Sequence, residues 1–281
     1  MDKHVDAVLG KAEEIAASGD ATKTLALLRQ LNLQQFGEIL ISLPNVRYPN
    51  ISRILPRMAS AEVQRNWTGN DGIALLRQTN SFVDLLSRTV DLKSVNRVLD
   101  FGCGYGRILR AFYYYVDPDR LYGCDPWDES IRLCREADIL GHLAISDYLP
   151  TRLPFEEKFD LTYAFSVFTH LSERATRACL TALVEASTGI IAITIRPPQY
   201  WDFNLSITTA TRDHLLVDHN AGRFAFSPHT RSPIDGDITY GDSSFSIDWL
   251  KAHFSNLEVI DTRSIPGDPL QTLVLLRRRS S

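Results

Sequence analysis

Apolar residues recur at steps of three and four along the first 43 residues, the spacing that places side chains on one face of a helix. The repeat breaks at Ser18-Gly19-Asp20 and stops at Pro44, so we expect three successive helices. Residues 45–71 contain Pro49, Pro56 and Gly69 and predict irregular structure, whereas 72–88 again has a helical repeat. The first 89 residues are therefore predicted to form a helical arm or cap.

The pattern changes near residue 90, where short apolar runs alternate with helix-like stretches. The runs lie at 97–101, 121–125, 159–165 and 189–195, and the helical stretches at 105–115, 128–137 and 172–186. This alternation predicts βαβ units and a parallel sheet covered on both faces. Two later runs, 257–262 and 272–276, are separated by a segment too short for a helix, so this pair is expected to be antiparallel.

Composition and charge narrow the class of protein. The chain has 281 residues, of which 44% are hydrophobic and 23% charged, with a net charge of −4. These values exclude a disordered chain, a fibre and a disulfide scaffold, and without a basic block we expect no nucleic-acid partner. We also expect no membrane partner and a cytoplasmic location, because no long apolar stretch or secretory signal is present. The four cysteines form no CxxC pair, so no metal is expected.

A glycine-rich loop follows the first predicted strand and opens a helix. It reads Asp100-Phe-Gly-Cys-Gly-Tyr-Gly106. Glycines at alternate positions let the backbone approach a ligand closely. The dinucleotide fingerprint GxGxxG requires a glycine where Arg107 stands. The loop therefore favours a ligand other than a dinucleotide, the alternative being a tight turn without a ligand.

The ordered motifs resemble those of the class I S-adenosylmethionine-dependent methyltransferases. The glycine loop is similar to the first family motif, and Asp125 stands where that family has an acidic residue after the second strand. Asp147-Tyr148 and the segment 159–171 continue the resemblance in the same order. It implies a Rossmann-like α/β fold, doubly wound, with a mostly parallel seven-stranded sheet and an antiparallel last strand. The implied domain covers 90–281, with an inserted lid at 196–245.

The resemblance also implies S-adenosyl-L-methionine as cofactor and assigns roles to residues. Asp125 would accept the ribose hydroxyls, although a helix N-cap is the alternative. Asp147 would accept the adenine amino group beside Tyr148, unless it is a solvated loop residue. The expected cofactor-binding residues are Trp67, Thr68, Asp100, Gly102, Cys103, Gly104, Gly106, Asp125, Pro126, Asp147, Tyr148, Phe165 and Ser166. For Trp67 and Thr68 the alternative is a packed tryptophan followed by a turn glycine.

Two histidines are candidates for the catalytic base. His170 follows the predicted strand at 159–165, with a structural role as the alternative, and His229 lies in the long insertion. Loops of this length are usually lids or binding segments, and this one is rich in aromatic and histidine side chains, although it is equally compatible with a subdomain that buries its own aromatics. The residues expected to bind substrate are Arg196, Tyr200, Trp201, Tyr240 and Asp242.

The leading hypothesis is therefore O-methylation of a small molecule or glycan-like hydroxylated acceptor, with a histidine as base. N-methylation of a small molecule and a non-catalytic cofactor-binding protein remain alternatives. A nicotinamide oxidoreductase is disfavoured by Arg107 and by the terminal antiparallel pair. A homo-oligomer formed through the helical arm is a further expectation.

Overall fold

The computed structural model of the protein describes residues 3–279. Its main sheet has seven strands in the order β3-β2-β1-β4-β5-β9-β8. β2 pairs in parallel with β1 and β3, and β4 pairs in parallel with β5, whereas β9 runs antiparallel to both β5 and β8. This confirms the predicted doubly wound, mostly parallel sheet with a reversed last strand.

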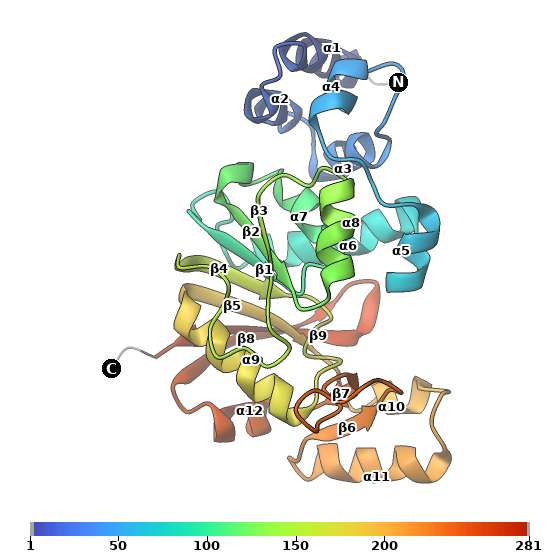
Figure 1. The fold of residues 1–281 in the computed structure, drawn as a ribbon, viewed down its shortest axis with the longest axis vertical. Helices are drawn as coiled ribbons and strands as arrows, with labels where there is room; N and C mark the ends of the chain where they lie inside the picture. Colours follow the sequence, from blue (N-terminus) through green and yellow to red (C-terminus); the bar gives the residue numbers. More distant parts are fainter. Residues whose placement is uncertain (1–2, 280–281) are drawn as a thin grey trace. The chain divides into compact units, whose positions relative to one another are not determined.

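The chain divides into two compact units, Met1–Ile145 and Ser146–Ser281. In the first unit, helices precede three strands and their connections (Figure 1). Its elements are α1 (Lys3–Ala16), α2 (Ala21–Leu28), α3 (Leu33–Ile41), α4 (Pro49–Ile54), α5 (Ala61–Thr68), α6 (Gly72–Ser87), β1 (Val98–Phe101), α7 (Arg107–Phe112), η1 (Pro118–Arg120), β2 (Leu121–Asp125), α8 (Asp128–Glu136) and β3 (His142–Ile145).

Polar residues begin the helices where the sequence pattern changes. The Asp20 side chain accepts a hydrogen bond from the Lys23 N–H and so caps α2. Asn32 and Gln35 form a reciprocal capping box at the start of α3. Such caps satisfy the orphan N–H groups of the first helical turn. The three helices predicted for residues 1–43 are therefore confirmed.

The prediction of irregular structure over 45–71 is wrong in part, because α4 and α5 lie there. Pro49 occupies the first turn of α4, where proline is favoured because an N–H at this position would have no acceptor within the helix. The Ser60 side chain caps α5, and Gly69 ends that helix in the left-handed conformation with φ 77°. Proline and glycine thus mark the ends of two short helices in this segment.

The second unit holds the remaining strands and an inserted segment with its own helices. Its elements are β4 (Phe159–Ala164), α9 (Glu173–Ala186), β5 (Ser187–Ile195), α10 (Tyr200–Phe203), α11 (Thr209–Asn220), β6 (Ala225–Pro228), β7 (Gly241–Ser244), α12 (Ile247–His253), β8 (Leu257–Ile265) and β9 (Asp268–Arg278). The segment between β5 and α12 includes a separate two-stranded antiparallel sheet, β6-β7.

The inserted segment has a small core of its own, in which Trp201, Leu215 and Ala225 are buried together. In Figure 1 α11 lies beside β6, which it contacts. Burial of Trp201 favours the subdomain interpretation of this insertion. The predicted limits of the arm at 89 and of the lid at 196–245 stay predictions.

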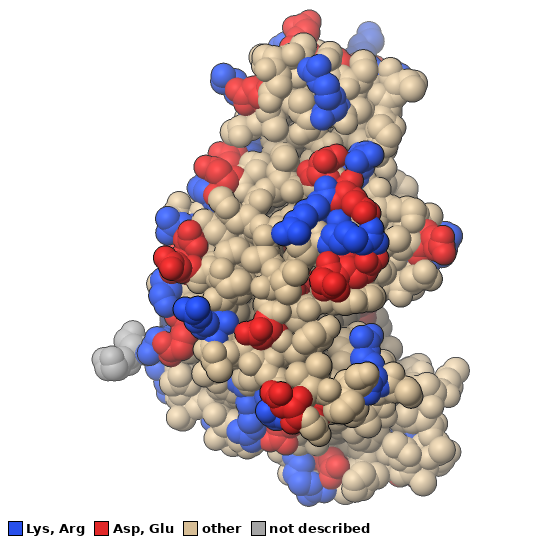
Figure 2. All heavy atoms as spheres, viewed as in Figure 1, with Lys and Arg blue, Asp and Glu red and all other residues tan. Residues whose placement is uncertain are grey.

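The surface carries charges of both signs. On the face drawn in Figure 2, acidic and basic side chains are interspersed. Within residues 3–279, no helix is long and apolar enough to cross a membrane. The expectations about nucleic-acid, membrane and oligomeric partners stay predictions.

Candidate functional site

The glycine loop between β1 and α7 bends through three left-handed residues. Gly102, Gly104 and Gly106 have φ values of 76°, 54° and 78°, a region that favours glycine. The N–H groups of Gly102 and Cys103 both donate to the carbonyl of Cys124, at 2.8 and 3.1 Å. The loop is therefore fixed to β2 by hydrogen bonds, and because its glycines carry no side chains its backbone stays open to close approach.

Asp125 ends β2 and contacts this loop directly. Its Oδ2 accepts a hydrogen bond from the Gly104 N–H at 3.0 Å, and its Oδ1 accepts one from the Trp127 N–H at 2.9 Å. Burial raises the pKa of Asp125, and the two N–H donors oppose that rise. An ionised carboxylate offers about four acceptor positions, and the Ser130 hydroxyl also lowers the pKa of this one, so acceptor capacity remains for a further donor.

Trp67, at the C-terminal end of α5, packs on the same loop. A Cβ added to Gly104 would lie 3.4 Å from the Trp67 ring. The ring also stacks on Trp127, with centroids 4.9 Å apart and an interplanar angle of 18°. Sequence reasoning missed Trp127, although it directly follows the predicted pair Asp125-Pro126. The Thr68 hydroxyl donates to the Gln64 carbonyl at 2.7 Å.

The other residues expected to bind the cofactor differ in exposure. Asp100 and Cys103 are buried in the first unit. In the second unit, Asp147 and Tyr148 are exposed in the segment before β4, whereas Phe165 is buried. The roles of these residues toward a cofactor stay predictions.

Ser166 follows β4 in a strained conformation, with φ 59°. Its N–H donates to the Thr194 Oγ1 at 2.7 Å, and that hydroxyl donates to the Gln271 Oε1 at 2.7 Å. Positive φ at a residue other than glycine costs about 1–3 kcal/mol and persists where neighbouring contacts fix it. Such strain at the end of a strand is typical of a functional loop.

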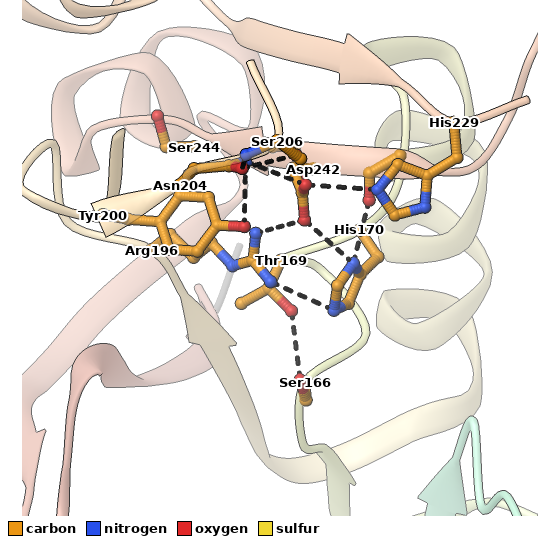
Figure 3. Close-up of polar contacts among 12 residues, drawn as sticks. Ser166, Thr169, His170, Arg196, Tyr200, Asn204, Ser206, His229, Asp242 and Ser244 are labelled. Atoms are coloured by element: carbon orange, nitrogen blue, oxygen red, sulfur yellow. Dashed lines mark hydrogen bonds and ion pairs between the residues drawn. The ribbon is translucent and has the colours of Figure 1, made fainter. Parts of the chain in front are cut away.

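Four of the predicted residues meet in one polar network of the second unit (Figure 3). Arg196, just after β5, donates from Nη1 to the Asp242 Oδ1 and from Nη2 to the His170 Nε2 at 3.2 Å. The His229 Nε2 lies 3.1 Å from the Asp242 Oδ2. The His170 Nδ1 lies 3.5 Å from the Asp242 Oδ1, so the structure brings both candidate bases to the same carboxylate.

Burial and charge decide the ionisation of this network. Burial alone would raise the pKa of Asp242, but Arg196 and the hydrogen bonds from His229 and Tyr200 lower it below its ordinary value. Burial, followed by the charge of Arg196, lowers the pKa of His170 to about 4. At neutral pH His170 is therefore uncharged beside an ionised Asp242.

Tyr200 and Asn204 extend the network from α10 and the residues that follow it. The Arg196 guanidinium lies 3.6 Å from the centroid of the Tyr200 ring. Asn204 donates to the Asp242 Oδ2 at 3.0 Å and to the Tyr200 hydroxyl at 3.2 Å. Sequence reasoning missed Asn204, because a lone asparagine carries no motif.

Two other residues expected to bind substrate have different surroundings. The Tyr240 ring stacks on His170, with centroids 5.1 Å apart and an angle of 7°, and Arg231 lies 4.4 Å from the Tyr240 centroid. Trp201 is fully buried, and its Nε1 donates to the Ser244 Oγ at 2.7 Å. Trp201 is therefore a core residue of the insertion.

The histidines of α11 point to different partners. The His219 Nδ1 lies 2.8 Å from the Ser244 Oγ in a buried contact, whereas the His214 Nε2 lies 3.4 Å from the Asp218 Oδ2. Among residues 3–279, no group of three or more histidine, cysteine, aspartate or glutamate side chains is arranged to hold a metal ion.

Comparison with known families finds one matching model. Residues 98–187 match a family described as "Methyltransferase domain". The match begins at β1, includes the glycine loop and Asp125, and ends at the start of β5. A comparison with curated proteins by sequence gives no match.

Several solved structures similar to this chain are methyltransferases. An S-adenosylmethionine-dependent methyltransferase from Clostridium acetobutylicum ATCC 824 has 11% sequence identity and a TM-score of 0.52, over 78% of this chain and 97% of the other. Magnesium protoporphyrin IX methyltransferase from Synechocystis PCC 6803, with bound SAH, has 14% identity and a TM-score of 0.50, over 78% and 94%. The CcbJ methyltransferase from Streptomyces caelestis has 12% identity and a TM-score of 0.51, over 78% and 96%. At such identities the likeness shows a shared fold.

Proposed function

We propose that this chain is a class I S-adenosylmethionine-dependent methyltransferase and that it methylates a hydroxyl oxygen of a small or glycan-like molecule; the match of residues 98–187 to a methyltransferase domain supports this. S-adenosylmethionine, when bound, supplies an electrophilic methyl group on a sulfonium sulfur. The protein must then hold the acceptor in line with that methyl group and remove the hydroxyl proton. The proposal therefore requires a cofactor cradle and a base.

The residues of the first unit fit the cofactor. Gly102 and Gly104 leave the backbone of the loop without side chains, which suits close approach of a ligand. The Asp125 carboxylate keeps acceptor capacity beyond its bonds to the Gly104 and Trp127 N–H groups, which suits a ribose hydroxyl. Trp67 and Trp127 add aromatic surface next to these groups. We assign the ribose to Asp125 and the methionine end to the loop.

The observation that carries the proposal is the pairing of His229 with Asp242. A carboxylate only accepts hydrogen bonds, so the His229 Nε2 is the protonated nitrogen of this contact at 3.1 Å. The Nδ1 then has a lone pair that takes a proton. The His229 side chain is 42% exposed, whereas that of Asp242 is 9% exposed. This arrangement gives an accessible base oriented by a buried carboxylate, the partnership used in general-base catalysis.

The charge of the network supports a neutral acceptor. The Arg196 guanidinium is already paired with Asp242 and bonded to His170. The charge of Arg196 is therefore compensated within the protein. A hydroxyl group of a neutral small molecule or glycan suits such a site.

The test follows transfer of a labelled methyl group from S-adenosylmethionine to a panel of phenols, sugars and other hydroxylated small molecules, with amines included. We expect an O-methylated product, identified by mass and NMR spectra. His229→Asn, which keeps polarity and removes the base, should lower kcat by about 10²–10⁴-fold while cofactor affinity is unchanged. His214→Asn, on the exposed face of α11, is the matched control. Products formed only from amines, or an unchanged rate in His229→Asn, would contradict the proposal.

A further inference from the structure

His170 contacts several members of the polar network. Its ring stacks on Tyr240, and its side chain is 19% exposed. Its Nδ1 lies 2.8 Å from the carbonyl oxygen of Gly241, on β7, and its Nε2 lies 3.2 Å from the Arg196 Nη2. Both ring nitrogens are therefore engaged within the protein.

These two contacts fix the tautomer of the ring. A carbonyl oxygen only accepts, so the His170 Nδ1 carries a proton and donates it to Gly241. A guanidinium only donates, so the His170 Nε2 carries none and accepts from Arg196. The ring is thus a neutral imidazole with no lone pair left for an acceptor molecule. A base role for His170 would require breaking its bond to Arg196.

The bond from Arg196 has a consequence at Asp242. The guanidinium is a rigid planar fork, so fixing Nη2 on His170 also fixes the direction of Nη1 toward the Asp242 Oδ1. The other carboxylate oxygen, Oδ2, is then left for His229 and Asn204. The two oxygens of Asp242 therefore have separate partners.

We propose that His170 is a positioning residue: it orients Arg196, Arg196 orients the Asp242 carboxylate, and Asp242 holds His229 as the Nε2–H tautomer with a basic Nδ1. This inference rests on the proposed role of His229 and adds a residue that acts on it through Arg196 and through Asp242, whose Oδ1 lies 3.5 Å from the His170 Nδ1. The charged and titratable groups that face His170 are Arg196 after β5, Asp242 on β7, His229 after β6 and Tyr240 before β7.

The first test needs no substrate. Long-range proton–nitrogen NMR of the full chain, labelled with 15N-histidine, reports which ring nitrogen of each histidine is protonated. We expect His170 to stay a neutral Nδ1–H imidazole from pH 8 down to pH 5, and His229 to be Nε2–H where it is neutral. A His170 ring that becomes charged near pH 6.5, or one that is Nε2–H, would overturn the proposal.

The second test removes the positioning contact. His170→Phe keeps a ring to stack on Tyr240 but neither donates nor accepts, whereas His170→Asn keeps one donor and one acceptor. In the Phe variant we expect neutral His229 to become a mixture of both tautomers, with partial return to Nε2–H in the Asn variant. An unchanged His229 tautomer in His170→Phe would refute the role.

The control for this series is His142→Phe, which replaces a histidine stacked on Tyr122 in the first unit; it should leave the His229 signals unchanged. Retained circular dichroism shows that each variant has folded, and the wild-type spectrum decides the proposal if a variant does not. Because these signals are measured without an acceptor, failure of O-methylation and failure of the positioning role are distinguishable.

Discussion

Replacing Asp242 by asparagine would remove one charge from a buried pair and leave the other in place. The Arg196 and Asp242 side chains are 10% and 9% exposed. Removing one partner of a buried ion pair costs about 3–5 kcal/mol. Arg196 would keep its contacts with His170 and Tyr200, so we expect Asp242→Asn to lower the free energy of unfolding by about 3 kcal/mol, the lower end of that range.

Calorimetric melting at neutral pH measures this loss. For a chain of this size 1 kcal/mol shifts the Tm by about 2–4 °C, so Asp242→Asn should lower it by about 6–12 °C. The control is Asp218→Asn, whose partners Arg223 and His214 are 57% and 74% exposed. Exposed pairs contribute about 0–1 kcal/mol. If both variants melt alike, the network is not a buried ion pair and the reasoning is wrong.

The pH dependence gives the same prediction a second check. The pKa of Asp242 is lower in the folded protein than its ordinary value of 3.8. The stability that its charge contributes is therefore fully present above that value and is lost as the pH falls through the lower folded pKa. The difference in stability between the wild type and Asp242→Asn should hold from pH 8 to pH 5 and narrow only in stronger acid.

Three further predictions concern single residues. Asp125→Asn should weaken binding of S-adenosylmethionine about 10–100-fold by calorimetry, because charge-assisted hydrogen bonds contribute about 1.5–3 kcal/mol; equal affinity in a folded variant would contradict the ribose assignment. Gly104→Ala should lower the free energy of unfolding by about 1–3 kcal/mol in denaturant titrations, because the φ of Gly104 is 54° and the Trp67 ring is close. The control is Gly10→Ala, in open space on α1, which should raise the free energy of unfolding by about 0.5–1 kcal/mol. The His170 pKa is lowered from 6.5 to about 4, so between these pH values the unfolded chain binds a proton that the folded chain does not. The stability of the folded protein should therefore rise with pH across that window, by up to roughly 3 kcal/mol at 1.36 kcal/mol per pKa unit. A His170→Asn variant with an equally steep rise would refute this.

The sheet was predictable because its signals are local. Each parallel strand except β3 is a short apolar run next to a helical stretch, and the glycines of the loop at 102–106 follow β1 directly. The short segment between β8 and β9 also excluded a helix there. By contrast α4 was missed because Pro49 was interpreted as a break, although proline is also favoured in the first turn of a helix.

The polar network was predictable only as a set of residue types. The sequence singled out His170, Arg196, His229 and Asp242, but their partners lie far along the chain: Arg196 and Asp242 are 46 positions apart, and His170 and Gly241 are 71 apart. No local pattern shows which nitrogen meets which oxygen. Hence the division of roles between the two histidines came only from their hydrogen bonds.

The most direct test of the central claim is isothermal titration of the full chain with S-adenosylmethionine and with its demethylated product, S-adenosylhomocysteine. A methyltransferase of this kind should bind both at one site per chain, and Asp125→Ala should abolish binding while the protein stays folded. Absence of heat from either molecule at high micromolar concentration, in a folded sample, would contradict the account.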